Sequence, residues 1–216
     1  MKRFLRPAAA ALALVCAAIL RPGDLRAATC TWDGSSNDWN TSTAHWSCGA
    51  IPGSGDSIVV GSGTVTLGTS HSVTGVTLTG GVIDGAGNLS VSGAFSWTGG
   101  TMSGSGTTTI AATSTLAINS GGVGIQRQIT NNGTITWQAG QLQMSNGTID
   151  NNATFTAQPD NSIANFGGTN AFHNNAAGTF TRDTGTGQMD MNIPFTNAGT
   201  LTVSTGEMRI NGTGSS

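Results

Sequence analysis

A six-residue pattern recurs along the second half of this chain. It reads Asn-Asn-Gly-Thr-Ile-Thr at 131–136 and Asn-Asn-Ala-Thr-Phe-Thr at 151–156, and looser copies lie at 174–181 and 197–202. The first threonine of each copy stands at 134, 154, 179 and 200, so the successive steps are 20, 25 and 21. A repeat of this length is typical of solenoids, in which each unit stacks on the one before it.

The residues inside each repeat favour strands over helices. Thr-apolar-Thr alternates with the two-residue period of a strand, so one set of side chains points inward and the other outward. Charged residues make up only 8% of the chain, and Gly, Thr, Ser and Asn take their place on the surface; these residues suit strands and turns and disfavour helices. We therefore predict an all-β fold of stacked β-coils, a β-solenoid, with about 20–23 residues per coil. The alternative, a sandwich of hairpins, would show turns at intervals of about 8–12 residues and no long repeat.

In-register stacking predicts where the repeated side chains go. The central apolar residues form a core ladder of Ile135, Phe155, Phe180 and Leu201. The flanking residues form an outward threonine ladder, a candidate binding face, of Thr134, Thr136, Thr154, Thr156, Thr179, Thr181, Thr200 and Thr202. The asparagines before them are expected at corners, where each bonds to the next asparagine up the stack.

The first half of the solenoid, predicted to span 57–216, keeps the same period. Phe95-Ser96-Trp97 matches Ile135-Thr136-Trp137. The separation of Trp97 and Trp137 along the chain equals two coils of the repeat, so the two tryptophans are expected two turns apart on one column.

Residues 28–56 differ from the rest of the chain. They hold Trp32, Trp39 and Trp46, together with Cys30 and Cys48. An even pair of cysteines in an exported chain is expected to form a disulfide. We predict a stapled, tryptophan-rich N-terminal cap, because the first coil of a solenoid otherwise exposes an unpaired strand edge and an open core.

Residues 1–27 are predicted to be a signal peptide. Lys2, Arg3 and Arg6 precede an apolar run from 8 to 20, which is too short to span a bilayer of about 30 Å. An uncleaved anchor is the alternative. The mature chain is expected to be secreted or to lie at the outer cell surface, with no stable membrane span.

Removal of residues 1–27 leaves a chain poor in positive charge. It keeps three basic residues, Arg127, Arg182 and Arg209, against nine acidic ones, for a net charge of −6, and it has no lysine. Nucleic acids attract proteins through a cationic surface, so no nucleic-acid partner is expected.

Several segments resemble a known class of proteins. Cys30-Thr31-Trp32-Asp33-Gly34, His45-Trp46-Ser47 and Pro52-Gly53-Ser54-Gly55-Asp56 resemble the N-terminal module of bacterial surface proteins of the autotransporter and adhesin type, and Trp97-Thr98-Gly99-Gly100-Thr101-Met102 resembles their passenger repeats. The resemblance implies export, a right-handed parallel β-helix and display outside the cell. The sequence ends in mid-repeat at Ser216, so a truncated C-terminus is expected.

No catalytic, cofactor or metal site is predicted. Glycoside hydrolysis needs two facing carboxylates, and the acidic residues are scattered singly. At the period of this repeat, Asp160 and Asp183, or Asp183 and Arg209, could stack; single turn-forming aspartates are the simpler interpretation. The cap also contains three aspartates, Asp33, Asp38 and Asp56. They could bind calcium, or they could form hydrogen bonds within turns.

The predicted function is therefore that of an exported structural or adhesive solenoid, with carbohydrate or surface proteins as partners. Two alternatives stay open: a carbohydrate-active β-helix enzyme, of the polysaccharide lyase or hydrolase type, and a solenoid that binds ice or another lattice through its threonine rows. The uneven steps of 20, 25 and 21 argue against a flat array and hence against the lattice.

Overall fold

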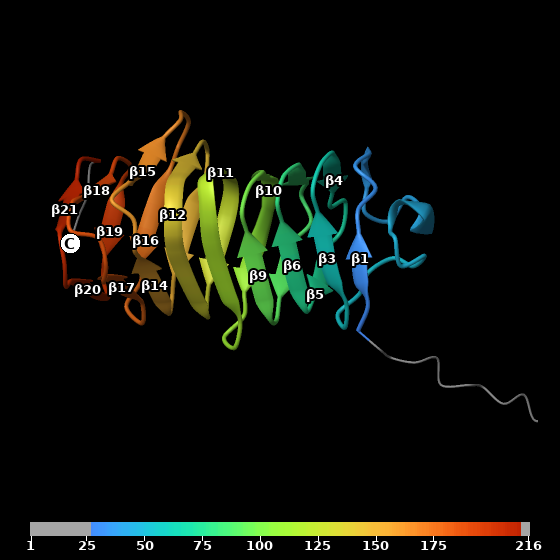
Figure 1. Cartoon of the computed structure of the whole chain (residues 1–216), viewed down its shortest axis with the longest axis horizontal. Helices are drawn as coiled ribbons and strands as arrows, with labels where there is room; N and C mark the ends of the chain where they lie inside the picture. The colour runs from blue at the N-terminus through green and yellow to red at the C-terminus, as the bar shows by residue number, and fades with distance from the viewer. Residues whose placement is uncertain (1–26, 213–216) are drawn as a thin grey trace, which may run out of the picture.

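The chain forms a parallel β-solenoid of about eight turns (Figure 1). The computed structural model describes residues 27–212, so the predicted signal peptide lies outside the described residues except for Ala27. Neighbouring strands in the stack are parallel and belong to consecutive turns, as in the pairing of β3 with β6. A hairpin sandwich would pair consecutive strands in antiparallel fashion, so the prediction of a solenoid is confirmed.

A complete turn passes through three strand segments, some of which are parts of one long strand, and the stacked segments form three faces. The threonine face comprises β1 (Thr29–Thr31), β3 (Ser57–Val60), β6 (Gly75–Leu78), β9 (Ala94–Trp97), the start of β11 (Thr115–Asn131), the start of β12 (Thr134–Met144), β14 (Thr154–Ala157), β17 (Thr179–Arg182) and β20 (Thr200–Val203).

The acidic face comprises β2 (Ser36–Asp38), β4 (Thr64–Thr66), β7 (Val82–Asp84), the start of β10 (Thr101–Ile110), the middle of β11, the end of β12, β15 (Ser162–Asn165), β18 (Gln188–Met191) and β21 (Glu207–Ile210). The third face comprises β5 (His71–Val73), β8 (Leu89–Val91), the ends of β10 and β11, β13 (Thr148–Asn151), β16 (Ala171–Asn174) and β19 (Phe195–Asn197).

The length of a turn varies around the value expected from the repeat. The residue number increases by 18 from Ile58 to its partner Val76, but by 25 from Phe155 to its partner Phe180. Strand pairing fixes the spacing between turns but leaves the corners free to hold more or fewer residues. The variation in length is therefore located at the corners.

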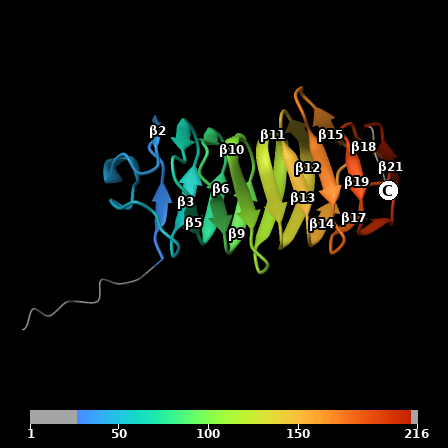
Figure 2. The ribbon, with the colours of Figure 1, turned by 180° about the vertical axis from the view of Figure 1, so that it is seen from behind.

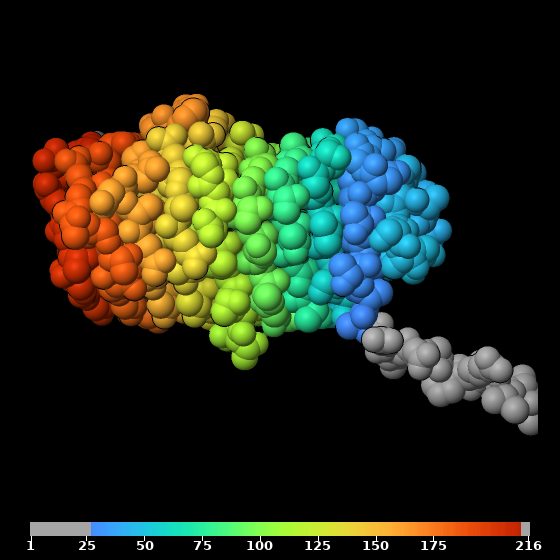
Figure 3. Space-filling model, viewed as in Figure 1, coloured from blue at the N-terminus to red at the C-terminus, as the bar shows by residue number. Residues whose placement is uncertain are grey.

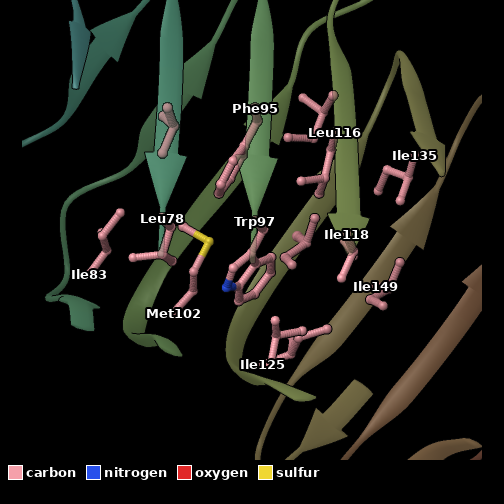
Figure 4. Packing of buried hydrophobic residues seen from close by; sticks show 14 of the residues in the cluster. Leu78, Ile83, Phe95, Trp97, Met102, Leu116, Ile118, Ile125, Ile135 and Ile149 are labelled. Atoms are coloured by element: carbon pink, nitrogen blue, oxygen red, sulfur yellow. The ribbon is translucent and has the colours of Figure 1, made fainter. Parts of the chain in front are cut away.

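The core is a set of side-chain columns that run along the solenoid (Figure 4). Leu78, Trp97 and Ile118 are register partners in consecutive turns, and Trp137 follows in the next. Trp97 and Trp137 thus lie on one column two turns apart, as the sequence predicts. Each turn alone could not bury its apolar face, so the neighbouring turns supply the cover.

A loop from the first turn covers the N-terminal end of the solenoid (Figure 2). It carries a short 3-10 helix, η1 (Thr43–His45), and the Cys30–Cys48 disulfide ties it to β1. Trp39 and Trp46 are fully buried in it, with ring centroids 4.8 Å apart. The opposite end consists of β20 and β21, where Val203 and Ile210 are exposed.

The space-filling view shows a rod whose turns follow one another along its long axis (Figure 3). Within residues 27–212, no helix has the length and apolar character needed to cross a membrane.

Candidate functional site

The eight threonines of the predicted ladder lie in two columns on the threonine face. The first column contains Thr134, Thr154, Thr179 and Thr200, and the second contains Thr136, Thr156, Thr181 and Thr202. Three of the eight, Thr154, Thr200 and Thr202, are exposed, and the others are half-buried by their neighbours in the stack.

The face extends well beyond these eight residues. Toward the N-terminus the first column continues through Thr115, Ala94, Gly75, Ser57 and Thr29, and the second through Ala117, Ser96, Thr77, Val59 and Thr31. Every outward side chain in both columns is therefore small and uncharged. The sequence pattern missed this extension because Ala, Gly, Val and Ser interrupt the Thr-x-Thr signal while keeping the strand alternation.

The two columns define a regular grid. Neighbouring strands in a sheet lie about 4.8 Å apart, and alternate residues of one strand lie about 6.7 Å apart. From β12 to β20 a threonine occupies every point of this grid. The grid carries hydroxyl and methyl groups only, so neither a long side chain nor a charge projects from it.

The unequal sequence steps do not disturb the grid, contrary to what the sequence suggests. Through the long turns the offset between register partners grows from one face to the next: the residue number increases by 21 from Leu142 to Ile163, by 23 from Ile149 to Phe172, by 25 from Phe155 to Phe180 and by 28 from Ile163 to Met191. The extra residues thus enter at the corners. Register from β14 to β17 is continuous along the whole of both strands, so the inserted residues do not interrupt the alignment of the two threonine columns.

The predicted core ladder lies directly behind the grid. Ile135, Phe155 and Phe180 are fully buried, and Leu201 is partly buried because no further strand covers it among the described residues. The rings of Phe155 and Phe180 are stacked, with centroids 5.2 Å apart and planes 9° from parallel. Close-packed aromatic rings hold the strands in front of them at constant spacing.

An asparagine ladder follows the corner between the third face and the threonine face. The side-chain amide of Asn131 donates to Asn151 Oδ1, Asn151 donates to Asn174, and Asn174 donates to Asn197, each at 2.7 Å. These residues belong to the recurring asparagine motifs, so the predicted asparagine stacking is confirmed. The ladder fixes the corner beside the first threonine column.

Charged side chains project from the other two faces. They are Asp38, Asp84, Asp190, Glu207 and Arg209 on the acidic face, and Asp150 on the third face. On the third face Gln128 donates to Asp150 at 2.5 Å, and His173 Nδ1 lies 2.7 Å from the other carboxylate oxygen. The uncharged character is therefore particular to the threonine face.

The charge pairs that the sequence suggested for an enzyme are not the ones the fold forms. Arg209 pairs in register with Asp190, not with Asp183. Asp160 bonds to Arg182 and, at 3.0 Å, accepts from the backbone N–H of Gly187, while Asp183 lies exposed at a turn. The stacking of this turn therefore directs an arginine, rather than a second carboxylate, toward Asp160.

Two arginines, Arg127 and Arg182, are buried, which the sequence pattern did not predict. Arg127 donates to the backbone carbonyl oxygens of Gly106, Ser103 and Gly87 at 3.0, 3.2 and 2.8 Å. Burial lowers the pKa of its guanidinium. Its bonds span two turns, so the side chain serves as a corner clamp.

The aspartates of the cap are engaged by the backbone. Asp38 accepts from the N–H groups of Asn40 and Gly68, at 2.8 and 3.0 Å, and Asp56 accepts from those of Ala28 and Gly53, both at 2.9 Å. Such bonds are those of turn-forming aspartates, which favours the turn interpretation over calcium.

Asp33 closes a further turn in the cap and contacts His45. Hydrogen bonds from Ser35 and His45 hold its pKa at about 2. Ser35 and Asp33 both meet the same ring nitrogen of His45, Nδ1, at 3.3 and 2.6 Å. A serine–histidine–aspartate relay needs the two partners on different ring nitrogens, so this contact is not arranged as a catalytic triad.

The described residues contain no cluster of three or more His, Cys, Asp or Glu side chains placed to hold a metal ion. Cys30 and Cys48 are joined in the disulfide, as the sequence predicts. Comparison with protein-family models, with curated proteins and with solved structures finds no match to this chain.

Proposed function

We propose that this chain is an exported, non-enzymatic β-solenoid rod whose threonine face makes adhesive contacts outside the cell. The observation that carries the proposal is the continuity of the face. Two columns of small, uncharged residues run from β1 to β20, and no position in either column carries a charged or long side chain. The solenoid's other two faces carry charges and do not share this uniformity.

A face of this kind favours binding by many weak contacts. Each hydroxyl can donate and accept hydrogen bonds, directly or through water, and none gives much affinity alone. Repetition along a rigid rod converts weak contacts into useful avidity. Carbohydrate hydroxyls and the surfaces of proteins offer partner groups for contacts of this kind.

The cap supports an extracellular site of action. A disulfide joins its loop to the first strand, and disulfides persist in oxidising compartments. Together with the basic and apolar segments of residues 1–27, this favours export. The resemblance of the cap and the repeats to adhesin-type proteins agrees with the same location.

A binding assay tests the adhesive role. The purified chain is applied to a glycan array and to cell surfaces, beside Thr154→Lys on the threonine face and Thr148→Lys on the third face. We expect Thr154→Lys to weaken binding by at least about tenfold, because one long charged side chain lifts a flat partner from several contacts at once. Thr148→Lys, a matched change on another face, should bind as the unchanged chain does.

Loss of binding in both variants, or in neither, would exclude the threonine face as the binding surface. Release of reducing sugars from a polysaccharide by the unchanged chain would instead support the enzyme alternative.

Export is tested separately by fractionation and mass spectrometry of the chain expressed with residues 1–27. A product beginning near Ala28 outside the cytoplasm is expected; an intact N-terminus in the cytoplasm would contradict export.

A further inference from the structure

We propose that the threonine face binds ice. The inference deepens the proposed function and rests on it for the use of this face, and it names an ordered lattice of water as the ligand. Three properties of the face lead to it: the regularity of its grid, the stiffness of its side chains and the absence of charge from both columns.

The grid has the regularity that a crystal surface requires. Five successive strands carry threonine in the first column, at Thr115, Thr134, Thr154, Thr179 and Thr200, and four carry it in the second. Identical groups therefore repeat in two directions, at about 4.8 Å along the rod and about 6.7 Å across it. A flexible glycan or a protein partner has no need of such periodicity, whereas a crystal face can be matched only by a periodic array.

The array is preorganised before it meets its ligand. Threonine is β-branched, so few rotamers are open to each side chain. Behind the grid, the stacked Phe155 and Phe180 and the ladder from Asn131 to Asn197 hold the strands in place. Little conformational entropy is then lost on binding, which matters because each contact with water is weak.

The chemistry of the face suits ordered water. Each threonine presents a hydroxyl that can join a hydrogen-bonded lattice of water. Its methyl group forms no hydrogen bond, so the adjacent water molecules bond to one another. Charged side chains hold strongly oriented hydration shells and would compete with the lattice. They project from the acidic and third faces, but none projects from either column of the threonine face.

The long step from Thr154 to Thr179 is the feature that had argued against a lattice. Its extra residues lie at corners, and the grid passes through this turn without a shift of register. The sequence repeat is uneven, but the surface repeat is not.

Thermal hysteresis and inhibition of ice recrystallisation test the proposal with the purified chain. We compare it with Thr156→Tyr, which has threonine on both sides of it in the second column, and with the matched Thr148→Tyr on the third face. Thermal unfolding of each variant verifies that it is folded. We expect measurable hysteresis in the unchanged chain, a reduction of at least about tenfold in Thr156→Tyr because a bulky ring breaks contact over several grid points, and no change in Thr148→Tyr.

Thr156→Val and Thr156→Ser separate the two parts of the chemistry, because one keeps the methyl group and the other the hydroxyl. Both should retain more activity than Thr156→Tyr, since both preserve the flat surface.

Absence of hysteresis and of recrystallisation inhibition in the folded, unchanged chain would overturn the proposal. Equal loss of ice activity in the two tyrosine variants would also overturn it. So would burial of the threonine face in a dimer, which light scattering would detect and which Thr156→Tyr would convert to a monomer. Glycan and cell binding by the same proteins is scored independently. Cell binding without ice activity rejects the ice ligand and keeps the adhesive role; loss of both rejects the face altogether.

Discussion

At the scale of single residues, the corner asparagines carry out two tasks. Asn151 donates to the side chain of Asn174 and to the backbone carbonyl oxygens of Ala153 and Thr179, and it accepts from Asn131. At a corner, some backbone N–H and C=O groups have no hydrogen-bond partner in a neighbouring strand. The asparagine side chains supply the missing hydrogen bonds. An asparagine therefore stabilises the turn that contains it and the turn stacked upon it.

Substitution Asn151→Ala tests this role. It leaves several buried polar groups without partners, which costs about 1–3 kcal/mol of unfolding free energy. Urea denaturation followed by circular dichroism measures the loss. Asn152→Ala is the control, because Asn152 bonds to Asn132 and Asn175 in an outer, more exposed row, where water can replace the lost bonds. A loss as large for Asn152→Ala would show that burial of the ladder is not what matters.

His71 makes the stability of the cap depend on pH. Its ring stacks on Trp39, with centroids 4.4 Å apart, and burial lowers its pKa from the ordinary 6.5. The unfolded chain then binds a proton at a higher pH than the folded chain does. The contribution of His71 to the unfolding free energy is fully present above about pH 6.5, and it falls as the pH decreases from there toward the pKa of the folded state.

We expect the midpoint of thermal unfolding to decrease as the pH is lowered below 6.5, and His71→Gln to remove that part of the decrease. Asp33, with its pKa near 2, contributes a separate loss between about pH 4 and pH 2, which His71→Gln should leave in place. Identical pH profiles for the two proteins above pH 4 would contradict the assignment to His71.

At the scale of elements, the N-terminal cap depends on its disulfide. Cys30 lies in β1 and is fully buried, while Cys48 lies near the end of the covering loop. Besides η1 the loop has no strand of its own, and its backbone is joined to the chain after β1 by the antiparallel bridge between Trp32 and Trp46. The covalent link therefore restricts the unfolded chain and keeps Trp39 and Trp46 over the open end.

Replacement of both cysteines by alanine should lower the unfolding free energy by about 2–4 kcal/mol. Reduction of the unchanged protein with dithiothreitol should produce the same shift in denaturant midpoint, and tryptophan fluorescence should report exposure of the cap. A double variant as stable as the unchanged chain would show that the tryptophan packing alone holds the loop.

At the scale of the whole molecule, stability is expected to vary along the rod. Each turn contacts only its neighbours, so an inner turn is held from two sides and the last one from a single side. Among the described residues, β20 and β21 pair with preceding strands only. Leu201 and Met208 are partly buried there, in contrast to the full burial of Phe180 and Met189 one turn earlier.

Hydrogen exchange should therefore reveal a gradient. We expect the lowest protection in Thr200–Ile210 and the highest in the middle turns, from β11 to β14. Mass spectrometry of peptides from the exchanged protein measures this distribution. Uniform protection from β3 to β21 would mean that the solenoid opens as one cooperative unit.

The sequence determined the fold class and the identity of the stacked residues. The recurrence of Asn-Asn-x-Thr-apolar-Thr was enough to assign which residue lies above which, because strand pairing in a solenoid joins chemically equivalent positions. It was sufficient to identify the core ladder, the corner asparagines and the eight threonines. The even pair of cysteines, together with the predicted signal peptide, was sufficient to predict the disulfide.

The tertiary structure determined the features that depend on how the corners between strands accommodate extra residues. Sequence steps count every residue of a turn, whereas the flatness of a face depends only on those in strands; the additional residues between Thr154 and Thr179 therefore looked like a disruption and are not one. The uniform face of β1 to β9 and the burial of Arg127 and Arg182 also depend on the stacking of turns, which places residues that are far apart in the sequence next to one another. These contacts could not be predicted from the sequence, because the stacking of the turns determines which residues become neighbours.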